Sequence, residues 1–301
     1  MTPGTLKTPI EQQTPQREAR SEIGIFAFLR RLKRGKLARV GAGIVAIVLF
    51  TAAFSPYLAP YDPTYQELID LLQNPNSTYL LGTDDLGRDI LSRIIYGARV
   101  SVQVGVIAVT ISLVIGVAIG LLSGYHGGIL DNVIMRVMDA LLAFPALVLA
   151  LAITAVLGPS LTNVMIAIGV VGVPSYARLV RGQVLSVKGW EFVQAARTIG
   201  VKDFHIMMRH IFPNVTAPII VQASLNIATA ILSEAGLSFL GLGVQPPTPS
   251  WGSMLNEGRG YIEIAPWMTI APGTAIFLTV LGFNFLGDGI RDALDPRLKE
   301  E

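Results

Sequence analysis

Few residues of this chain have a type and spacing that could carry out covalent chemistry. The 301 residues include three His and no Cys, which excludes disulfides, thiolate metal sites and cysteine nucleophiles. His126, His205 and His210 lack the spacing of a metal site. Ser123 and His126 could form a nucleophile–base pair, but the segment around Ser123 lacks a nucleophile motif. An intramembrane hydrolase is therefore a competing hypothesis that the sequence disfavours, and we expect no catalytic residue.

The chain also lacks the motif that binds the phosphates of ATP. No Gly-x-x-x-x-Gly-Lys-[Ser/Thr] segment occurs, so a process driven by ATP would need a separate ATPase. Asp84, Asp85 and Asp89 lack the spacing and the central Gly of a calcium-binding loop. We expect them to cap and solubilise an external helix over residues 86–95. No cofactor and no resident metal are expected.

Glu234 is the one acidic residue within a long apolar stretch that begins near Val215. If a spanning helix starts there, Glu234 lies roughly 28 Å along it and close to the external interface. Two interpretations remain open. The carboxylate could reach lipid headgroups or cap a neighbour, or it could belong to an external gate or solute path. Gln222 and Asn226, in the same stretch, are further candidates for that path.

A long connection at residues 178–213 carries an amphipathic pattern. Apolar residues recur at helical spacing in both halves, namely Phe192, Val193, Ala196 and Ile199, then Phe204, Met207, Met208 and Ile211. Gly200 would end the first helix, Asp203 could cap the second, and Pro213 would break the chain before the next long helix. The pattern predicts a rigid projection suited to a groove on a partner. A surface helix packed on its own bundle is the alternative.

Long uncharged segments indicate that membrane-spanning helices position these residues. The chain is 51% hydrophobic and 15% charged, with a mean hydropathy of +0.56, whereas a soluble domain is about one quarter charged. A spanning helix needs roughly 20 apolar residues. Six such helices are predicted, at about 40–59, 101–124, 133–157, 161–180, 214–240 and 264–287. The expected fold class is an all-α polytopic membrane protein with six transmembrane helices.

The basic residues indicate the orientation in the membrane. With the N-terminus in the cytoplasm, only four of the 23 Lys and Arg residues would lie outside, namely Arg88, Arg93, Arg99 and Arg259. This asymmetry favours N-in and C-in. A basic run at 30–39 follows Ile23, Phe26 and Leu29, which predicts an amphipathic helix on the inner leaflet of the bilayer. The net charge of +2 is too small for an electrostatic nucleic-acid binder.

The spans divide the chain into segments. We expect a disordered cytoplasmic tail at 1–21, the amphipathic helix and the first span at 22–60, an external segment at 61–98, a five-helix core at 99–288 and a cytoplasmic tail at 289–301. In the second span, Gly116, Gly120 and Gly124 share one helical face, which lets another helix approach closely. That helix could belong to the same bundle or to a second membrane subunit.

The loop at 178–213 resembles the EAA loop of binding-protein-dependent ABC importer permeases, through Gln194-Ala195-Ala196, Gly200 and His210-Ile-Phe-Pro213. In that family the coupling helix of the loop docks into an ATP-binding subunit. The resemblance implies ATPase-coupling roles for Gln194, Ala195, Ala196, Arg197, Gly200, Val201, His210 and Pro213. Gln194 stands where the family has Glu, so a neutral hydrogen bond would replace an ion pair. Docking would then depend on shape and apolar contact.

Further motifs at 81–99, 237–247 and 287–296 resemble the dipeptide/oligopeptide/nickel permeases. The extra N-terminal span, followed by Ala59-Pro-Tyr-Asp-Pro63, is similar to their "C" subunit. The resemblance covers about residue 28 to the end of the chain. It implies a type I ABC importer permease fold in the cytoplasmic membrane of a bacterium or archaeon. It also implies a heterodimer with a homologous "B" permease, two ATP-binding subunits and an extracellular or periplasmic solute-binding protein.

Import of di- or oligopeptides by alternating access is the resulting hypothesis, and ATP would be hydrolysed in the partner subunits. Nickel chelates and glutathione-type peptides are alternatives within the same family. An ion-coupled secondary transporter is a distant alternative, because the expected spans hold almost none of the buried ionisable groups that a proton or ion relay needs.

Overall fold

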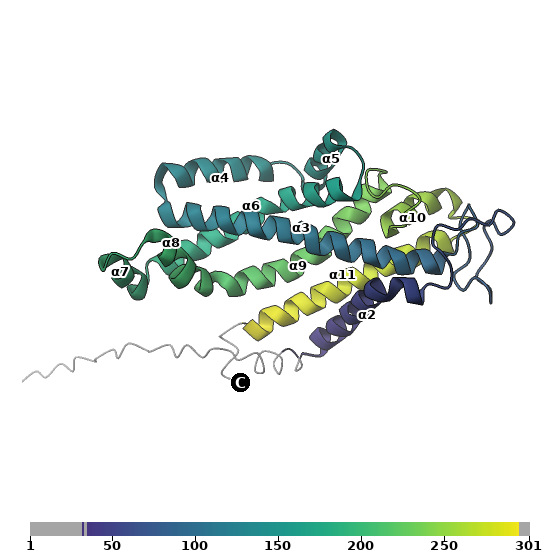
Figure 1. The fold of residues 1–301 in the computed structure, drawn as a ribbon, viewed down its shortest axis with the longest axis horizontal. Coiled ribbons are helices and arrows are strands. Elements are labelled where there is room, and N and C mark those ends of the chain that lie inside the picture. The colour runs from purple at the N-terminus through teal and green to yellow at the C-terminus, as the bar shows by residue number, and fades with distance from the viewer. Residues whose placement is uncertain (1–31, 33–34, 295–301) are drawn as a thin grey trace, which may run out of the picture.

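The computed structural model describes residue 32 and residues 35–294, and every regular element in this part of the chain is helical. Long helices run nearly along one direction, with short helices at both ends of the bundle (Figure 1). The long helices are α2 (Lys36–Leu58), α3 (Ile90–His126), α6 (Leu161–Lys188), α9 (Phe212–Phe239) and α11 (Trp267–Leu294). The shorter ones are α4 (Gly128–Leu142), α5 (Ala146–Leu157), α7 (Glu191–Thr198), α8 (Asp203–His205), η1 (Ile206–Ile211), α10 (Trp251–Gly258) and η2 (Arg259–Tyr261).

Within the described residues, five continuous helical segments are long and apolar enough to cross a membrane, and the pair α4 and α5 makes a sixth if it counts as one span. The expected third span at 133–157 is not one continuous helix, because α4 and α5 meet at a bend of 91°. Pro145 stands directly before α5. Proline lacks an amide donor and disfavours a helical conformation of the preceding residue, so the helix ends before it. The predicted tail at 1–21 and most of the predicted amphipathic helix lie outside the described residues. The tail expected from 289 begins later, because α11 continues to Leu294 and only 295–301 lie outside the described residues.

The end of the bundle formed by residues 59–89, α10 and η2 is called the cap here. The prediction of a short external helix at 86–95 is wrong, because α3 begins only at Ile90 and continues to His126. Asp89 caps α3 as predicted, since its carboxylate accepts from the backbone and hydroxyl of Ser92. Asp84 does not solubilise the segment: it is 2% exposed and binds Arg88.

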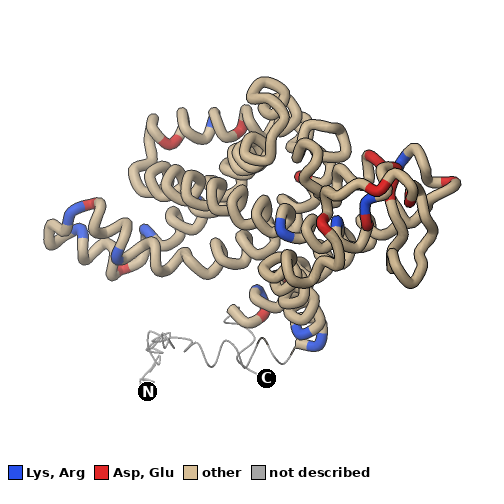
Figure 2. Tube along the Cα trace, turned by 45° about the vertical axis from the view of Figure 1, so that its right-hand side comes forward, with Lys and Arg blue, Asp and Glu red and all other residues tan. Residues whose placement is uncertain are grey.

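A buried ion network ties the cap together. The guanidinium groups of Arg88 and Arg93 each lie 2.8 Å from Glu257 of α10, and Arg88 also lies 2.6 Å from Asp84. Together they counter the carboxylates of Asp84, Asp85 and Glu257, which lie close to one another. Figure 2 shows charged residues gathered mainly at the two ends of the bundle and on α4, with long uncharged stretches between.

The glycine face of α3 packs against α6. A Cβ atom on Gly116 would lie 2.5 Å from the Cβ of Tyr176, and one on Gly120 would lie 2.6 Å from the carbonyl oxygen of Ala177. Gly124 meets Val184 in the same way. Such distances are too short for real atoms, so the absence of side chains is what allows the two backbones to approach. Of the two partners considered for this face, the structure places a helix of the same bundle there.

Candidate functional site

The loop at 178–213 lies at the opposite end of the bundle from the cap, and α7 projects beyond the long helices there (Figure 1). The expected loop is shorter than 178–213 because α6 continues to Lys188; we call residues 189–211 the coupling loop, after the role predicted for it. α7 spans Glu191–Thr198, and Gly200 adopts a φ of +81° that only glycine tolerates easily. The predicted helix and glycine turn are therefore confirmed.

The second half of the coupling loop differs from the prediction. Asp203 does not cap a helix; its carboxylate accepts a hydrogen bond from Tyr125. Pro213 does not break the chain either, since α8, η1 and α9 form one continuous helical run from Asp203 to Phe239. η1 is a π-helix, whose wider turn shifts the hydrogen-bond register just before the residue that lacks an amide donor. The Asn214 side chain also donates to the carbonyl of His210.

The apolar residues of the coupling loop divide between two directions. Val193 and Ala196 are buried and join Val184 of α6 and Ile206 of η1 in one hydrophobic cluster. Other apolar side chains are exposed: Ile199 is 80% exposed, Phe204 69%, Met208 43% and Trp190 43%. The loop is thus held to its own bundle on one side and presents an apolar tip on the other. Packing of the loop on its own bundle is thus observed, and docking of the exposed tip on a partner stays a prediction.

The residues that resemble the family motif have different surroundings. The Gln194 amide donates to the carbonyl oxygen of Lys188 at 2.8 Å, which joins α7 to the end of α6. Ala195, Arg197, Gly200 and Pro213 are exposed. Ala196 is buried, and Val201 and His210 are half-buried. Among the accessible members, Arg197 and Gly200 lie at the turn next to Ile199, whereas Ala195 lies within α7 and Pro213 at the start of α9.

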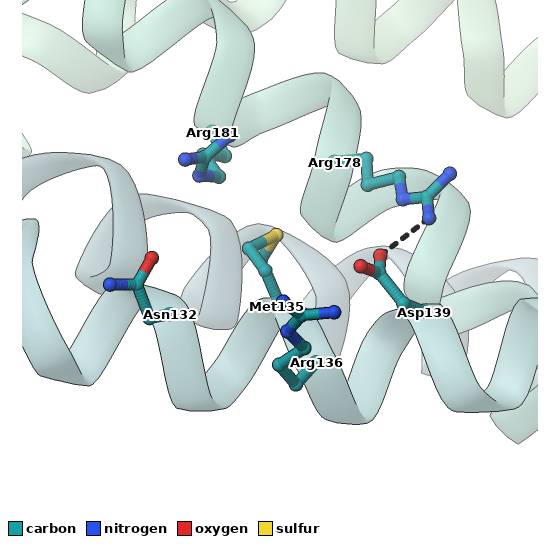
Figure 3. Close-up of a pocket in the computed structure, with 6 residues that line it drawn as sticks. All are labelled: Asn132, Met135, Arg136, Asp139, Arg178 and Arg181. Atoms are coloured by element: carbon teal, nitrogen blue, oxygen red, sulfur yellow. Dashed lines mark hydrogen bonds and ion pairs between the residues drawn. The ribbon is translucent and has the colours of Figure 1, made fainter.

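A hollow of about 520 Å³ lies between α4 and α6 close to the coupling loop. Figure 3 shows Arg136, Asp139 and Arg178 around it, with the Arg178–Asp139 ion pair at 2.5 Å. Arg181 also lines the hollow and binds Asp131 through two hydrogen bonds of 2.6 and 2.7 Å. Sequence reasoning missed these pairs. The available signal was the placement of Asp131 and Asp139 in α4, eight residues apart on a helix with a 3.6-residue repeat.

The Ser123–His126 pair considered for hydrolysis is not formed. The Ser123 hydroxyl donates to the Asp131 carboxylate, whereas the His126 ring contacts the carbonyl oxygen of Leu122. Ser123 is fully buried and His126 is exposed. The two side chains therefore have separate partners, and the geometry contradicts a nucleophile–base arrangement.

Two of the three candidates for a solute path lie together in the middle of the bundle. The Gln222 amide donates to Asn226 at 2.9 Å, and Asn226 lines a cavity of about 140 Å³ between α3, α6 and α9. Its other polar lining residues are Ser112, Ser175, Thr229 and Ser233. Ala146, the first residue of α5 after the 91° bend, also lines it.

Glu234 does not line this cavity. Its side chain is fully buried, so it does not reach headgroups, and it accepts a hydrogen bond of 2.6 Å from Ser238 one turn further along α9. Ser250, the N-cap residue of α10, also lies beside it. Glu234 thus lies where α9 meets the cap, away from Gln222 and Asn226.

Comparisons with known proteins agree with this architecture. Residues 116–300 match the family described as "binding-protein-dependent transport system inner membrane component", and residues 27–75 match the "N-terminal TM domain of oligopeptide transport permease C". The dipeptide transport system permease protein DppC of Alkalihalophilus pseudofirmus is 48% identical, over 99% of this chain and 97% of its own. The glutathione transport system permease protein GsiD of Escherichia coli is 46% identical, over 98% and 94%.

A solved structure shows the same fold. An inward-facing structure of the MetNI methionine ABC transporter superposes with a TM-score of 0.56 at 18% identity, covering 67% of this chain and 96% of that one. The matched family model and the near full-length relatives decide the assignment: this chain belongs to the inner membrane components of binding-protein-dependent transport systems, as the membrane-spanning permease of an ABC importer and not its ATPase.

Proposed function

We propose that this permease imports di- and oligopeptides and that its coupling loop receives the movement of an ATPase. The apolar tip of the coupling loop carries the proposal for the ATPase. Ile199 and Phe204 are large, apolar and mostly exposed, at the end of a loop whose other side is packed into its own bundle. Exposed apolar groups on a rigid projection are what a groove on a partner protein would bury.

The relatives support peptides as the solute class. Dipeptide and glutathione permeases are similar to this chain at nearly the same identity, and both solutes contain peptide groups. The cavity beside Asn226 suits such solutes, because its polar lining is made of neutral Ser, Thr and Asn side chains. These groups both donate and accept hydrogen bonds, so they can bind peptide N–H and C=O groups whatever the charge of the solute's side chains.

A component of a binding-protein-dependent system works with a solute-binding protein and an ATPase. We propose the finer arrangement: a heterodimer with a homologous "B" permease and two ATP-binding subunits, with both termini and the coupling loop in the cytoplasm and the cap facing the solute-binding protein. The tails at 1–21 and 289–301 would then lie in the cytoplasm and the segment at 61–98 outside, while 22–60 and 99–288 would hold the membrane-spanning helices, as the sequence predicts. The bend between α4 and α5, next to the cavity, is where access would change.

Crosslinking tests the docking of the coupling loop. Because the chain has no Cys, purified Ile199→Cys can be labelled with a photo-crosslinker at that one position before the complex is assembled. We expect it to crosslink to an ATP-binding subunit. Ile129→Cys is the matched control, since Ile129 is 82% exposed and follows the nearby start of α4, and we expect it to give no such product. Crosslinking from Ile129 but not from Ile199 would refute docking at the coupling loop.

Uptake by the reconstituted complex tests the solute. We expect ATP-dependent accumulation of a radiolabelled dipeptide that unlabelled di- and tripeptides compete away. Asn226→Leu should lower this uptake because it replaces the polar wall of the cavity with an apolar one, while the amount of assembled complex stays the same. Accumulation of a nickel chelate with no uptake of peptides would contradict the proposal.

A further inference from the structure

Tyr125, the penultimate residue of α3, contacts the end of α6 and both sides of the Gly200 turn of the coupling loop. Its hydroxyl donates to the Asp203 carboxylate at 2.5 Å, on the α8 side of the Gly200 turn. The Arg197 guanidinium of α7, on the other side of that turn, lies 5.6 Å from the centre of its ring. The Lys188 ammonium, at the end of α6, lies 5.5 Å from the ring and donates to the Tyr125 carbonyl oxygen.

These contacts differ from ordinary core packing. The Tyr125 side chain is 2% exposed and belongs to the hydrophobic cluster that includes Leu121, Val184 and Val193. Its hydroxyl, its ring and its carbonyl oxygen, however, each have a charged partner in or beside the coupling loop. A phenol–carboxylate hydrogen bond is charge-assisted and directional, and a cation over an aromatic ring adds a second attraction. Together they fix the angle between the coupling loop and α3.

α3 is able to carry a movement from this point to the cap. It is one continuous helix of 37 residues, about 55 Å long at the usual rise per residue. Its other end supplies Arg93, which is 1% exposed and pairs with Glu257 of α10. Between the two ends, the glycine face at Gly116 and Gly120 holds it against α6. A tilt imposed at Tyr125 therefore reaches the cap without passing through a break in the helix.

We propose that Tyr125 is the positioning residue that transmits movement of the coupling loop to α3, an inference that rests on the proposed docking of that loop to an ATPase. Tyr125 is not part of the docking surface, because its side chain is buried. Without the Tyr125 hydroxyl the coupling loop would still dock on the ATPase. It would then rotate relative to α3, however, instead of moving α3 with it. Loss of a charge-assisted hydrogen bond shifts such an equilibrium by about tenfold.

Tyr125→Phe in the complete complex separates transmission from docking. We expect crosslinking from Ile199→Cys and the amount of bound ATP-binding subunits to stay at the wild-type level. We expect stimulation of ATP hydrolysis by the dipeptide-loaded solute-binding protein, and dipeptide uptake per ATP hydrolysed, to fall severalfold. Asp203→Ala should reproduce this loss without adding to it in the double variant. Asp203→Asn, which keeps an acceptor oxygen for the phenol, should retain most of the wild-type stimulation and uptake.

Tyr57→Phe is the control. Tyr57 is 85% exposed on α2 and lies outside both the coupling loop and the cap, so we expect loss of its hydroxyl to leave the coupling ratio unchanged. Wild-type coupling in Tyr125→Phe and in Asp203→Ala would overturn the inference while docking stands. Loss of the ATP-binding subunits from Tyr125→Phe would also overturn it, because the hydroxyl would then serve docking. Absence of the crosslink in the wild-type background would instead refute the docking proposal itself.

Discussion

Two ion pairs join α4 to α6 with the same chemistry and different burial. Asp131 is 7% exposed, and its carboxylate accepts two hydrogen bonds from Arg181 and one from Ser123. The Asp139 and Arg178 side chains are about half exposed, at 48% and 51%, and share one contact. An exposed ion pair adds little stability, because solvent screens the attraction and both side chains lose conformational entropy. Removing one partner of a buried pair lowers stability more, because it leaves a buried charge without a counter-charge.

Replacing the two acids one at a time therefore has unequal effects. We expect Asp131→Ala to destabilise the protein by about 2 kcal/mol, because Arg181 and Ser123 both lose a charged partner. Asp139→Ala should stay within about 0.5 kcal/mol of wild type. Thermal unfolding of the two purified variants under identical conditions measures the difference, and equal melting temperatures would show that burial does not separate the two pairs.

Tyr79 provides a spectroscopic prediction in the cap. Its hydrogen bond to Asp70, followed by partial burial, raises the pKa of Tyr79 from its ordinary value of 10.0 to about 12. Because the pKa is raised on folding, the stabilisation from this bond is complete below pH 10 and is lost as the pH rises through about 12. In Asp70→Asn we expect the pKa of Tyr79 to fall towards 10. Phenolate absorbance in each protein, minus that of its Tyr79→Phe counterpart, reports it; an unchanged titration in Asp70→Asn would exclude this cause.

At the scale of elements, most helices follow from the uncharged stretches, but two prolines acted differently from each other. Pro145 ends a helix and gives the bend of 91°, whereas Pro213 lies inside a continuous helical run. Both lack an amide donor, so sequence alone does not distinguish them. The difference comes from tertiary packing. Before Pro213, η1 rearranges the backbone hydrogen bonds, and its residues Ile206 and Ile211 are fully buried, which keeps the helix continuous. Before Pro145, α4 has only two buried residues, so little packing opposes the bend.

The first half of the motif-bearing loop agrees with the prediction, whereas its second half does not. Gly200 and the spacing of Val193 and Ala196 locate α7 and its turn. Burial could not be assigned, because an amphipathic pattern does not say which apolar residues a protein keeps for itself. The partners of Tyr125 were unpredictable for another reason: Asp203 lies 78 residues away in the sequence, and no local pattern connects the two.

The contact between α3 and α6 predicts opposite effects for two helical glycines. A Cβ on Gly120 would lie 2.6 Å from the carbonyl oxygen of Ala177, so Gly120→Ala must push the helices apart. A Cβ on Gly182 of α6 meets no described atom within 4 Å. Gly182→Ala should therefore stabilise the helix by about 1 kcal/mol, and Gly120→Ala should lower the melting temperature. Stabilisation by Gly120→Ala would mean that the helices are not in close contact.

At the scale of the whole molecule, the cap and the coupling loop occupy opposite ends of a bundle that is mostly uncharged between them (Figure 2). Only four Lys and Arg residues lie in segments that the predicted orientation places outside. Segments rich in Lys and Arg stay in the cytoplasm, and an ATPase can use only the ATP on that side. The distribution of Lys and Arg and the cytoplasmic location of ATP thus favour the same orientation, with the coupling loop inside and the cap outside.

Labelling of single cysteines checks that orientation directly. Ile69 in the cap is 89% exposed and Ile199 in the coupling loop is 80% exposed, so both are open to a reagent on their own side. We expect a membrane-impermeant maleimide to label Ile69→Cys from outside intact spheroplasts and Ile199→Cys only in inverted vesicles prepared without the ATP-binding subunits, which would otherwise cover it. Because the protein has no other Cys, each signal comes from one position. The reverse pattern would place the coupling loop outside, where no ATPase could drive it, and would overturn the proposed mechanism together with the orientation.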